Sequence, residues 1–349
     1  MFNLQQTIAA VQTNCDIADA RHARDMSMCN YLLAMRDFYR WERQIPFVQP
    51  LNKGDIRDWL SQREAKWNEV EEINYLPIPV AGNDYDHFDT AAINCALKEH
   101  GLVYGSGYGN WGRPHFFLGQ LLRCEKSHNI SILVSGHEYA RNMAAPPAAL
   151  NRDTVFLRID AMQRWLLDKV EVWELNKGNS ALKATLDCYE SGEDVESKLA
   201  LIAEQEGDTL ILHELGEAMA GKMLGETWHE MLSSFQSRRH ELLARAVRDN
   251  LADCLVTLPE LIERDKTCSL HFYFSNFDGL RRGLFPSLAY AYDHWHKDGD
   301  ILELQNAIEA GYTHWLRVAQ DLVSAWIDDP ATAETMIENY GENFSKLAL

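Results

Sequence analysis

The sequence is short of positive charge and has no long apolar run. Its 349 residues contain 33 lysines and arginines against 52 aspartates and glutamates, a net charge of −19. That deficit repels nucleic acid and anionic lipid, so we expect no nucleic-acid partner. No apolar stretch approaches the roughly 20 residues that a membrane-spanning helix needs, and we expect no membrane partner. A basic partner or a cationic ligand fits an acidic surface better. A protein partner and a homo-oligomer both stay open, and the small-molecule ligand is unidentified.

The sequence also lacks the even number and close spacing of cysteines that indicate disulfide bonds or a metal site. The seven cysteines are odd in number, scattered and never spaced C-x-x-C, which predicts reduced thiols. The amino-terminal stretch has no basic residue before Arg21, unlike a secretory signal. We therefore expect a cytoplasmic protein.

What the sequence does contain is helical periodicity. Prolines are scarce after Pro146–Pro147, and the apolar spacing beyond that pair predicts helices over about 152–175, 181–205, 209–235, 237–264, 278–297, 301–328 and 331–346. Strands are indicated only by two apolar runs, 116–125 and 130–135, separated by a short polar turn. The prediction is a mainly α, multi-helix globular protein with a small β-hairpin or short sheet in its N-terminal half.

The domain organisation follows from the same pattern. Residues 1–147 form a mixed helical part with a glycine-rich loop and the hairpin, and residues 148–349 form an all-helical part; one continuous domain is the alternative. Within the loop, Gly107, Gly109 and Gly112 satisfy G-x-G-x-x-G, the pattern of dinucleotide-binding turns. Because no clear parallel strand leads into it and a proline follows, a flexible loop that turns into the hairpin is the better interpretation.

The segment LHELGE contains the sharpest chemical pattern. His213 and Glu217 are four residues apart, so on a helix both can reach one cation. Glu214 follows His213 as the general base follows the first histidine of H-E-x-x-H zinc peptidases, but Glu217 replaces the second histidine. A divalent metal such as zinc, iron or manganese would suit these donors, with Glu214 as the catalytic proton acceptor. Gly216 between them indicates close packing by a neighbour or a bend.

Three further residues are candidate metal ligands, although they do not belong to one site. Glu226 and His229 have the E-x-x-H spacing of carboxylate-bridged di-iron bundles. On one straight helix Glu217 and Glu226 would point to opposite sides, so a kink at Gly221 or Gly225 would be needed to join them; that glycine pair also suits close helix packing. His240 would likewise need a separate site.

A third ligand for His213 and Glu217 would come from another helix. His240, Glu241, His137 and Asp253 are all candidates that the sequence does not rank. Beside them, Glu241, Arg245 and Arg248 form one helical stripe flanked by Asp249. Such a stripe is a solvated face or a buried ion network beside a site, and the solvated face is the commoner case.

Three stretches, RPHFFLGQLL, LHELGE and RRHELLARAVRDNLADCLVTLPEL, carry a resemblance to a known group of proteins. At these stretches the chain resembles a family of uncharacterised bacterial proteins with no assigned activity. The resemblance implies a cytoplasmic bacterial protein and supplies no reaction. Two hypotheses therefore stay open: a metal or acid/base site built on residues 213–217, or a non-catalytic helical scaffold or interaction protein with an acidic surface.

Overall fold

The chain divides into two compact units. A computed structural model describes residues 2–109, 112–189, 194–342 and 347–349. Unit 1 comprises residues 1–172 and 191–204, and unit 2 comprises residues 173–190 and 205–349. The sequence-based boundary near residue 147, and the alternative of one continuous domain, remain predictions.

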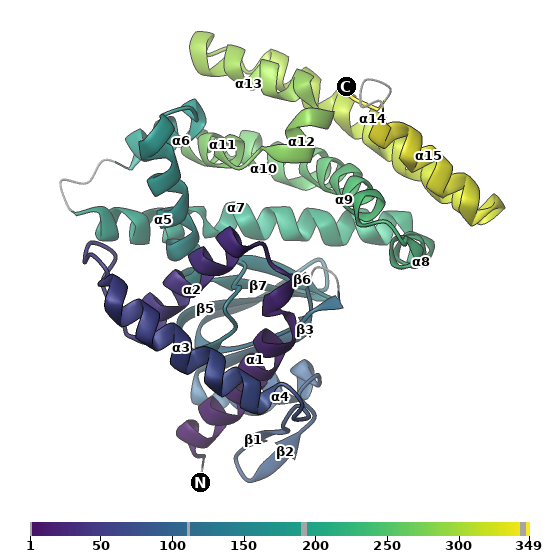
Figure 1. The fold of residues 1–349 in the computed structure, drawn as a ribbon. Coiled ribbons are helices and arrows are strands. Elements are labelled where there is room, and N and C mark those ends of the chain that lie inside the picture. Colours follow the sequence, from purple (N-terminus) through teal and green to yellow (C-terminus); the bar gives the residue numbers. More distant parts are fainter. Residues whose placement is uncertain (1, 110–111, 190–193, 343–346) are drawn as a thin grey trace. The chain divides into compact units, whose positions relative to one another are not determined.

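Unit 1 combines helices with two sheets (Figure 1). Its elements are α1 (Leu4–His22), α2 (Met28–Glu42), α3 (Lys53–Val70), β1 (Ile78–Val80), β2 (Asn83–Tyr85), α4 (Thr90–Leu97), β3 (Leu102–Tyr108), β4 (Pro114–Ser127), β5 (Ile130–Arg141), β6 (Ala148–Asn151), β7 (Thr154–Arg158) and most of α5 (Ile159–Asn176). Asparagine or serine side chains cap the first three helices: Asn3, Ser27 and Asn52 each accept a backbone N–H of the first turn.

The larger sheet has five strands in the order β3-β4-β5-β7-β6. All neighbours are antiparallel except β5 and β7, which are parallel. The sheet curls until its two edge strands approach each other, and the Asn151 side chain on β6 donates to the Ser106 carbonyl on β3 at 2.5 Å. The result is a partly closed barrel with an inner and an outer face.

The outer face of this sheet carries the main core of unit 1. Helix α1 crosses β4 and β5 (Figure 1) and buries Val11 and Cys15 against Tyr104, Phe116 and Leu118. The inner face holds a small apolar cluster of Val103, Phe117 and Phe156.

The predicted hairpin is confirmed, but the β content is larger than a small hairpin. His128 and Asn129 both have positive φ, 49° and 65°, which is the geometry of a two-residue hairpin turn between β4 and β5. Strand β3 also precedes the glycine-rich turn, and β6 and β7 occupy 148–158, where helix was expected. Gly107 lies in β3 and not in a flexible loop. A Cβ there would lie 2.8 Å from the Asn151 side chain of β6, so the glycine lets the two edge strands approach each other.

Unit 2 is helical throughout the residues that the structure describes. Its elements are the end of α5, α6 (Ser180–Cys188), α7 (Val195–Leu224, from residue 205 onward), α8 (Glu226–Ser234), α9 (Arg238–Ala252), a π-helical segment (Asp253–Thr257), α10 (Leu258–Glu263), α11 (Thr267–Ser275), α12 (Gly279–Leu284), α13 (Pro286–Asp298), α14 (Leu302–Asp328) and α15 (Pro330–Glu342). Helices α14 and α15 run side by side and pack on α9 (Figure 1). One core joins them, in which Trp228 and Trp315 are fully buried.

Two of the seven cysteines are bonded to each other. Cys188 at the end of α6 and Cys268 on α11 form a disulfide across 80 residues, with a Cα–Cα distance of 5.8 Å. The prediction that all seven thiols are reduced is therefore wrong for this pair. Cys15, Cys29, Cys95, Cys124 and Cys254 are free.

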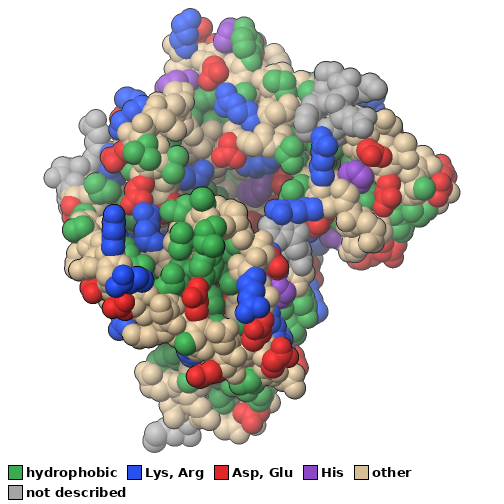
Figure 2. Space-filling model, in the orientation of Figure 1, with side chains coloured by type: hydrophobic (Ala, Val, Ile, Leu, Met, Phe, Trp, Pro, Cys, Tyr) green, Lys and Arg blue, Asp and Glu red, His purple; other side chains and the backbone are tan. Residues whose placement is uncertain are grey.

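The charged side chains are spread over the surface. Figure 2 shows acidic and basic groups interspersed over the face in view, as a net charge of −19 without an acidic tail predicts. None of the helices in the described part of the chain is long and apolar enough to cross a membrane.

Candidate functional site

The HELGE segment lies on α7, a helix of 30 residues. His213 and Glu217 share one face of it, and the His213 Nε2 atom lies 3.4 Å from Glu217 Oε1. Gly216 packs against the end of α9: a Cβ at this position would lie 2.7 Å from the Ala252 carbonyl oxygen. The close packing that Gly216 suggested is confirmed, and it brings the residues after Ala252 next to His213.

The contact between Gly216 and Ala252 places Asp253 beside His213. Its Oδ1 atom lies 2.7 Å from His213 Nδ1 and accepts from Thr257, while Oδ2 accepts from Tyr273 at 2.8 Å and from Arg281 at 2.9 Å. The side chain is 1% exposed. Asp253 opens the π-helical segment, and such local widening of a helix is frequent at functional sites because it redirects side chains.

Glu217 connects His213 to a second group of charges. Its Oε2 atom lies 2.5 Å from Arg248 Nη2, and the same guanidinium lies 2.9 Å from Asp249 Oδ1. A hydrogen bond with the Asp249 side chain also lowers the pKa of Glu217. We call His213, Glu217, Arg248, Asp249, Asp253 and Arg281 the His213 cluster. Asp249 is 22% exposed and His213 21%, so solvent reaches one side of it.

The environment separates the proton affinities of these groups. Burial alone would lower the pKa of His213, but the charge of Asp253 and its hydrogen bond outweigh burial and hold that pKa well above 6.5. Burial would raise the pKa of Glu217, yet the charge of Arg248 holds it far below its usual range. Burial and the nearby Glu217 raise the pKa of Asp249 from 3.8 to about 6. Near pH 6 the cluster therefore holds a protonated histidine, an ionised glutamate and an aspartate at its titration midpoint.

The donor atoms proposed for a metal are engaged by other groups. His213 uses one ring nitrogen for Asp253 and turns the other to Glu217, and Arg248 binds the remaining Glu217 oxygen. Across the described residues, no group of three or more His, Cys, Asp or Glu side chains is arranged to hold a metal ion. Glu214 lies near enough for its charge to act on Arg248.

The other three candidate ligands lie elsewhere on unit 2. Glu226 and His229 are exposed on α8. Helix α7 ends before Gly225, which has a φ of 79°, and the His229 ring lies 3.6 Å from where a Gly221 Cβ would be. His240 packs edge-on against Phe235. The chain therefore breaks at Gly225, one of the two positions considered for a kink, without bringing these residues to His213.

Sequence reasoning recovered part of the cluster and missed the rest. Asp253 was one of four candidates for the third position. The stripe on α9 divides between the two alternatives. Arg245 pairs with Glu241 within the helix, as on a solvated face, whereas Arg248 binds Glu217 of α7 and belongs to the buried ion network. Arg281 and Tyr273 were missed because they lie far from His213 in the sequence and no motif connects them to it.

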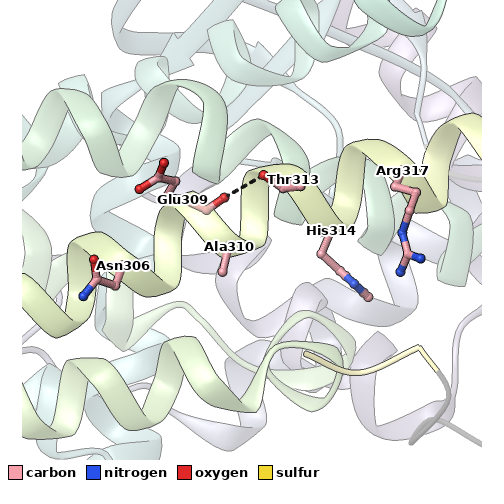
Figure 3. A pocket seen from close by; sticks show the side chains of 6 residues that line it. All are labelled: Asn306, Glu309, Ala310, Thr313, His314 and Arg317. Carbon is pink, nitrogen blue, oxygen red and sulfur yellow. Dashed lines mark hydrogen bonds between the residues drawn. The ribbon is translucent and has the colours of Figure 1, made fainter.

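A hollow lies on the surface of α14 (Figure 3). It encloses about 540 Å³ and is lined by Asn306, Glu309, Ala310, Thr313, His314 and Arg317. All these side chains come from one helix, and His314 already bonds the Leu347 carbonyl at 2.8 Å. Among the described residues, no second helix or strand lines this hollow, so it offers a ligand the side chains of one helix alone.

The fold and the cluster define an α/β unit with a curled sheet, followed by a helical unit with a buried ion network. The C-terminal domain model of the family of unknown function DUF6866 matches residues 163–343, and its N-terminal domain model matches residues 6–158. The chain belongs to this family, which confirms the resemblance to an uncharacterised family. No curated protein matches the chain, and no solved structure matches it.

Proposed function

We propose that unit 2 carries an acid/base site in which Asp249 gives and takes a proton while the neighbouring Glu217 stays ionised. The observation that supports this proposal is the pairing of two neighbouring carboxyl groups with proton affinities driven apart, one raised to about 6 and the other held far below its usual range. Pairs of titratable groups with separated pKa values are the usual arrangement for acid and base roles.

Each member of the cluster has a part in this proposal. Asp249 carries the exchangeable proton, and its partial exposure lets a ligand approach it. Arg248 binds both carboxyl groups and keeps Glu217 ionised. Asp253 fixes the His213 ring in its protonated form, which stabilises negative charge beside Glu217.

The geometry favours the acid/base half of the original hypothesis over the metal half. A cation at His213 and Glu217 would have to displace the Arg248 guanidinium and take a proton from His213, and both changes cost free energy in a buried site. Glu214, the proton acceptor proposed from sequence, would then act through Arg248 rather than on a metal-bound water. The non-catalytic scaffold remains the competing account, in which the cluster only joins helices.

Carbon NMR of labelled carboxyl groups tests this proposal. We expect Asp249 to titrate near pH 6 in the native chain and to shift toward its ordinary value in Glu217→Gln, which removes the neighbouring negative charge. Glu260→Gln, which alters an ion pair on the exposed side of α10, is the matched control and should leave Asp249 unchanged. An Asp249 that titrates near 3.8 in the native chain would leave the structural ion network as the better account.

A further inference from the structure

A second charged cluster lies in unit 1, on the inner face of the curled sheet. Ser135, Glu138 and Arg141 lie on β5 and pair across the sheet with Leu121, Gly119 and Phe117 of β4. Bulges in this pairing give β5 a spacing of three residues on that face instead of two. Arg158, the last residue of β7, pairs with Ser135 from the other side, and Arg164 follows on α5. We call Ser135, Glu138, Arg141, Arg158 and Arg164 the Glu138 cluster.

Glu138 lies at the centre of these side chains. Its Oε1 atom accepts from Arg158 Nε at 2.5 Å, and its Oε2 atom lies 3.9 Å from Arg141 Nη1, beyond hydrogen-bonding distance. Its backbone N–H donates to Asp160 Oδ2, which also accepts from Arg164. The Glu138 side chain is 0% exposed and that of Arg141 1%.

The cluster holds more donors than its own acceptors can satisfy. Five of its buried atoms have no hydrogen-bond partner: Ser135 Oγ, Glu138 Oε2, Arg141 Nη1, Arg158 Nη2 and Arg164 Nε. Buried polar atoms without a partner are rare in folded proteins and commonly mark the place of a missing water, ion or ligand. Three of the five are guanidinium donors, one is a hydroxyl, and the last is a carboxylate oxygen that can only accept.

We propose that the Glu138 cluster binds a small oxyanion that still carries one hydroxyl group, with hydrogenphosphate, hydrogencarbonate and 2-hydroxycarboxylates as the class. The three guanidinium groups and Ser135 donate to the oxyanion oxygens. The ligand hydroxyl donates to Glu138 Oε2 and accepts from Arg141 Nη1, which bridges the 3.9 Å gap. One water offers two acceptor lone pairs, too few for these donors, whereas an oxyanion offers enough.

The carboxylate of Glu138 gives the proposal its specificity. A fully deprotonated oxyanion such as sulfate would place a lone pair against Glu138 Oε2, with no proton between two acceptors. Leaving a buried acceptor unpaired lowers affinity by about tenfold or more. The cluster should therefore select protonated oxyanions over sulfate of nearly the same size.

Ligand-dependent thermal unfolding of the full chain at constant ionic strength tests the proposal. We expect saturable stabilisation by phosphate, hydrogencarbonate or lactate, and about tenfold weaker binding of sulfate. Glu138→Gln keeps an acceptor for Arg158 and offers an N–H to the ligand, so it should bind sulfate as well as phosphate. Glu171→Gln removes a carboxylate on α5 that pairs with Arg36 at the surface, and it should keep the native preference.

A second measurement needs no variant and covers the case in which Glu138→Gln does not fold. The Nε–H signal of Arg164 in the native chain should shift with phosphate at about tenfold lower concentration than with sulfate. Equal effects of phosphate and sulfate, or no effect of any member of the class, would overturn the proposal and assign the unpaired atoms to ordered water. The relative response to phosphate, hydrogencarbonate and lactate identifies which member of the class the cluster takes.

Discussion

Each unit of this protein contains a buried cluster of charged side chains. The two clusters differ in how many of their polar atoms have a hydrogen-bond partner. In the His213 cluster, Asp253 alone accepts from four side chains, and Glu217 has a partner at each oxygen. In the Glu138 cluster, three arginines and a serine keep donors without acceptors. A saturated network can store and transfer protons without a ligand, whereas an unsaturated one is complete only when something binds. The same residue types therefore support different functions.

The largest effect expected is the loss of the acceptor at the centre of the saturated cluster. Asp253→Ala would leave His213, Arg281 and Tyr273 buried without their partner, and breaking a buried charge network in this way costs about 3–5 kcal/mol. The midpoint of urea unfolding should fall accordingly. Glu303→Ala, which breaks the exposed pair with His294, should change stability by less than about 1 kcal/mol. Similar effects of the two changes would show that the His213 cluster is not tightly packed.

A disulfide distinguishes the two units as well. The bond between Cys188 and Cys268 joins α6 and α11 of unit 2 across 80 residues of sequence, so reduction or Cys268→Ser should destabilise that unit by about 2–4 kcal/mol. Hydrogen exchange of the α6 and α11 amides locates the effect. Cys29→Ser alters an exposed free thiol in unit 1 and should leave exchange unchanged. Unaltered exchange in α6 and α11 after complete reduction would mean that the bond contributes nothing to the native state.

Gly216 and Gly221, both on α7, should respond to substitution in opposite directions. Gly216→Ala places a Cβ 2.7 Å from the Ala252 carbonyl, which forces α7 away from α9 and costs about 1–3 kcal/mol. Gly221→Ala meets only the His229 ring at 3.6 Å, so the gain in helix propensity should stabilise the protein by about 1 kcal/mol. Thermal unfolding of both variants measures the difference. If Gly221→Ala destabilises the protein, Gly221 and Gly225 form a surface on which another helix packs closely.

The last comparison is between two buried aspartates whose pKa values are shifted in opposite directions. The charges of His213 and Arg281 overcome burial and lower the pKa of Asp253, so its stabilisation of unit 2 is present above about pH 4 and is lost as the pH falls. Burial raises the pKa of Asp19 in unit 1 from 3.8 to about 7, so its contribution is present below about pH 4 and is lost as the pH rises toward 7. Hydrogen exchange at a series of pH values measures the stability of each unit separately. Asp19→Asn should remove the fall in the stability of unit 1 as the pH rises. A parallel response of both units would contradict these assignments.

Sequence periodicity predicted the helical character, the β4–β5 hairpin and the pairing of His213 with Glu217, because these depend on local spacing. The strands β6 and β7 were missed because they are short and lie where the helical pattern begins. The Cys188–Cys268 bond was missed because its partners are 80 residues apart and no motif connects them.

The clusters themselves depend on tertiary contacts that spacing does not encode. Asp253 reaches His213 because Gly216 lets α9 approach and a π-helical segment turns the side chain. Glu138 and Arg141 share a face because of bulges in the β4–β5 pairing. A pattern of alternating residues would have placed them on opposite faces.

The protonation state of the His213 ring tests the acid/base account most directly. Nitrogen NMR of the ring between about pH 5 and pH 9, with and without zinc, reports both whether the ring holds its second proton and whether a metal competes for it. The account predicts that both ring nitrogens stay protonated through neutral pH and that zinc leaves them unchanged, because Asp253 and Glu217 hold the charged form. A ring that is neutral at pH 7, with a nitrogen signal that moves stoichiometrically with zinc, would contradict the account and favour the metal site.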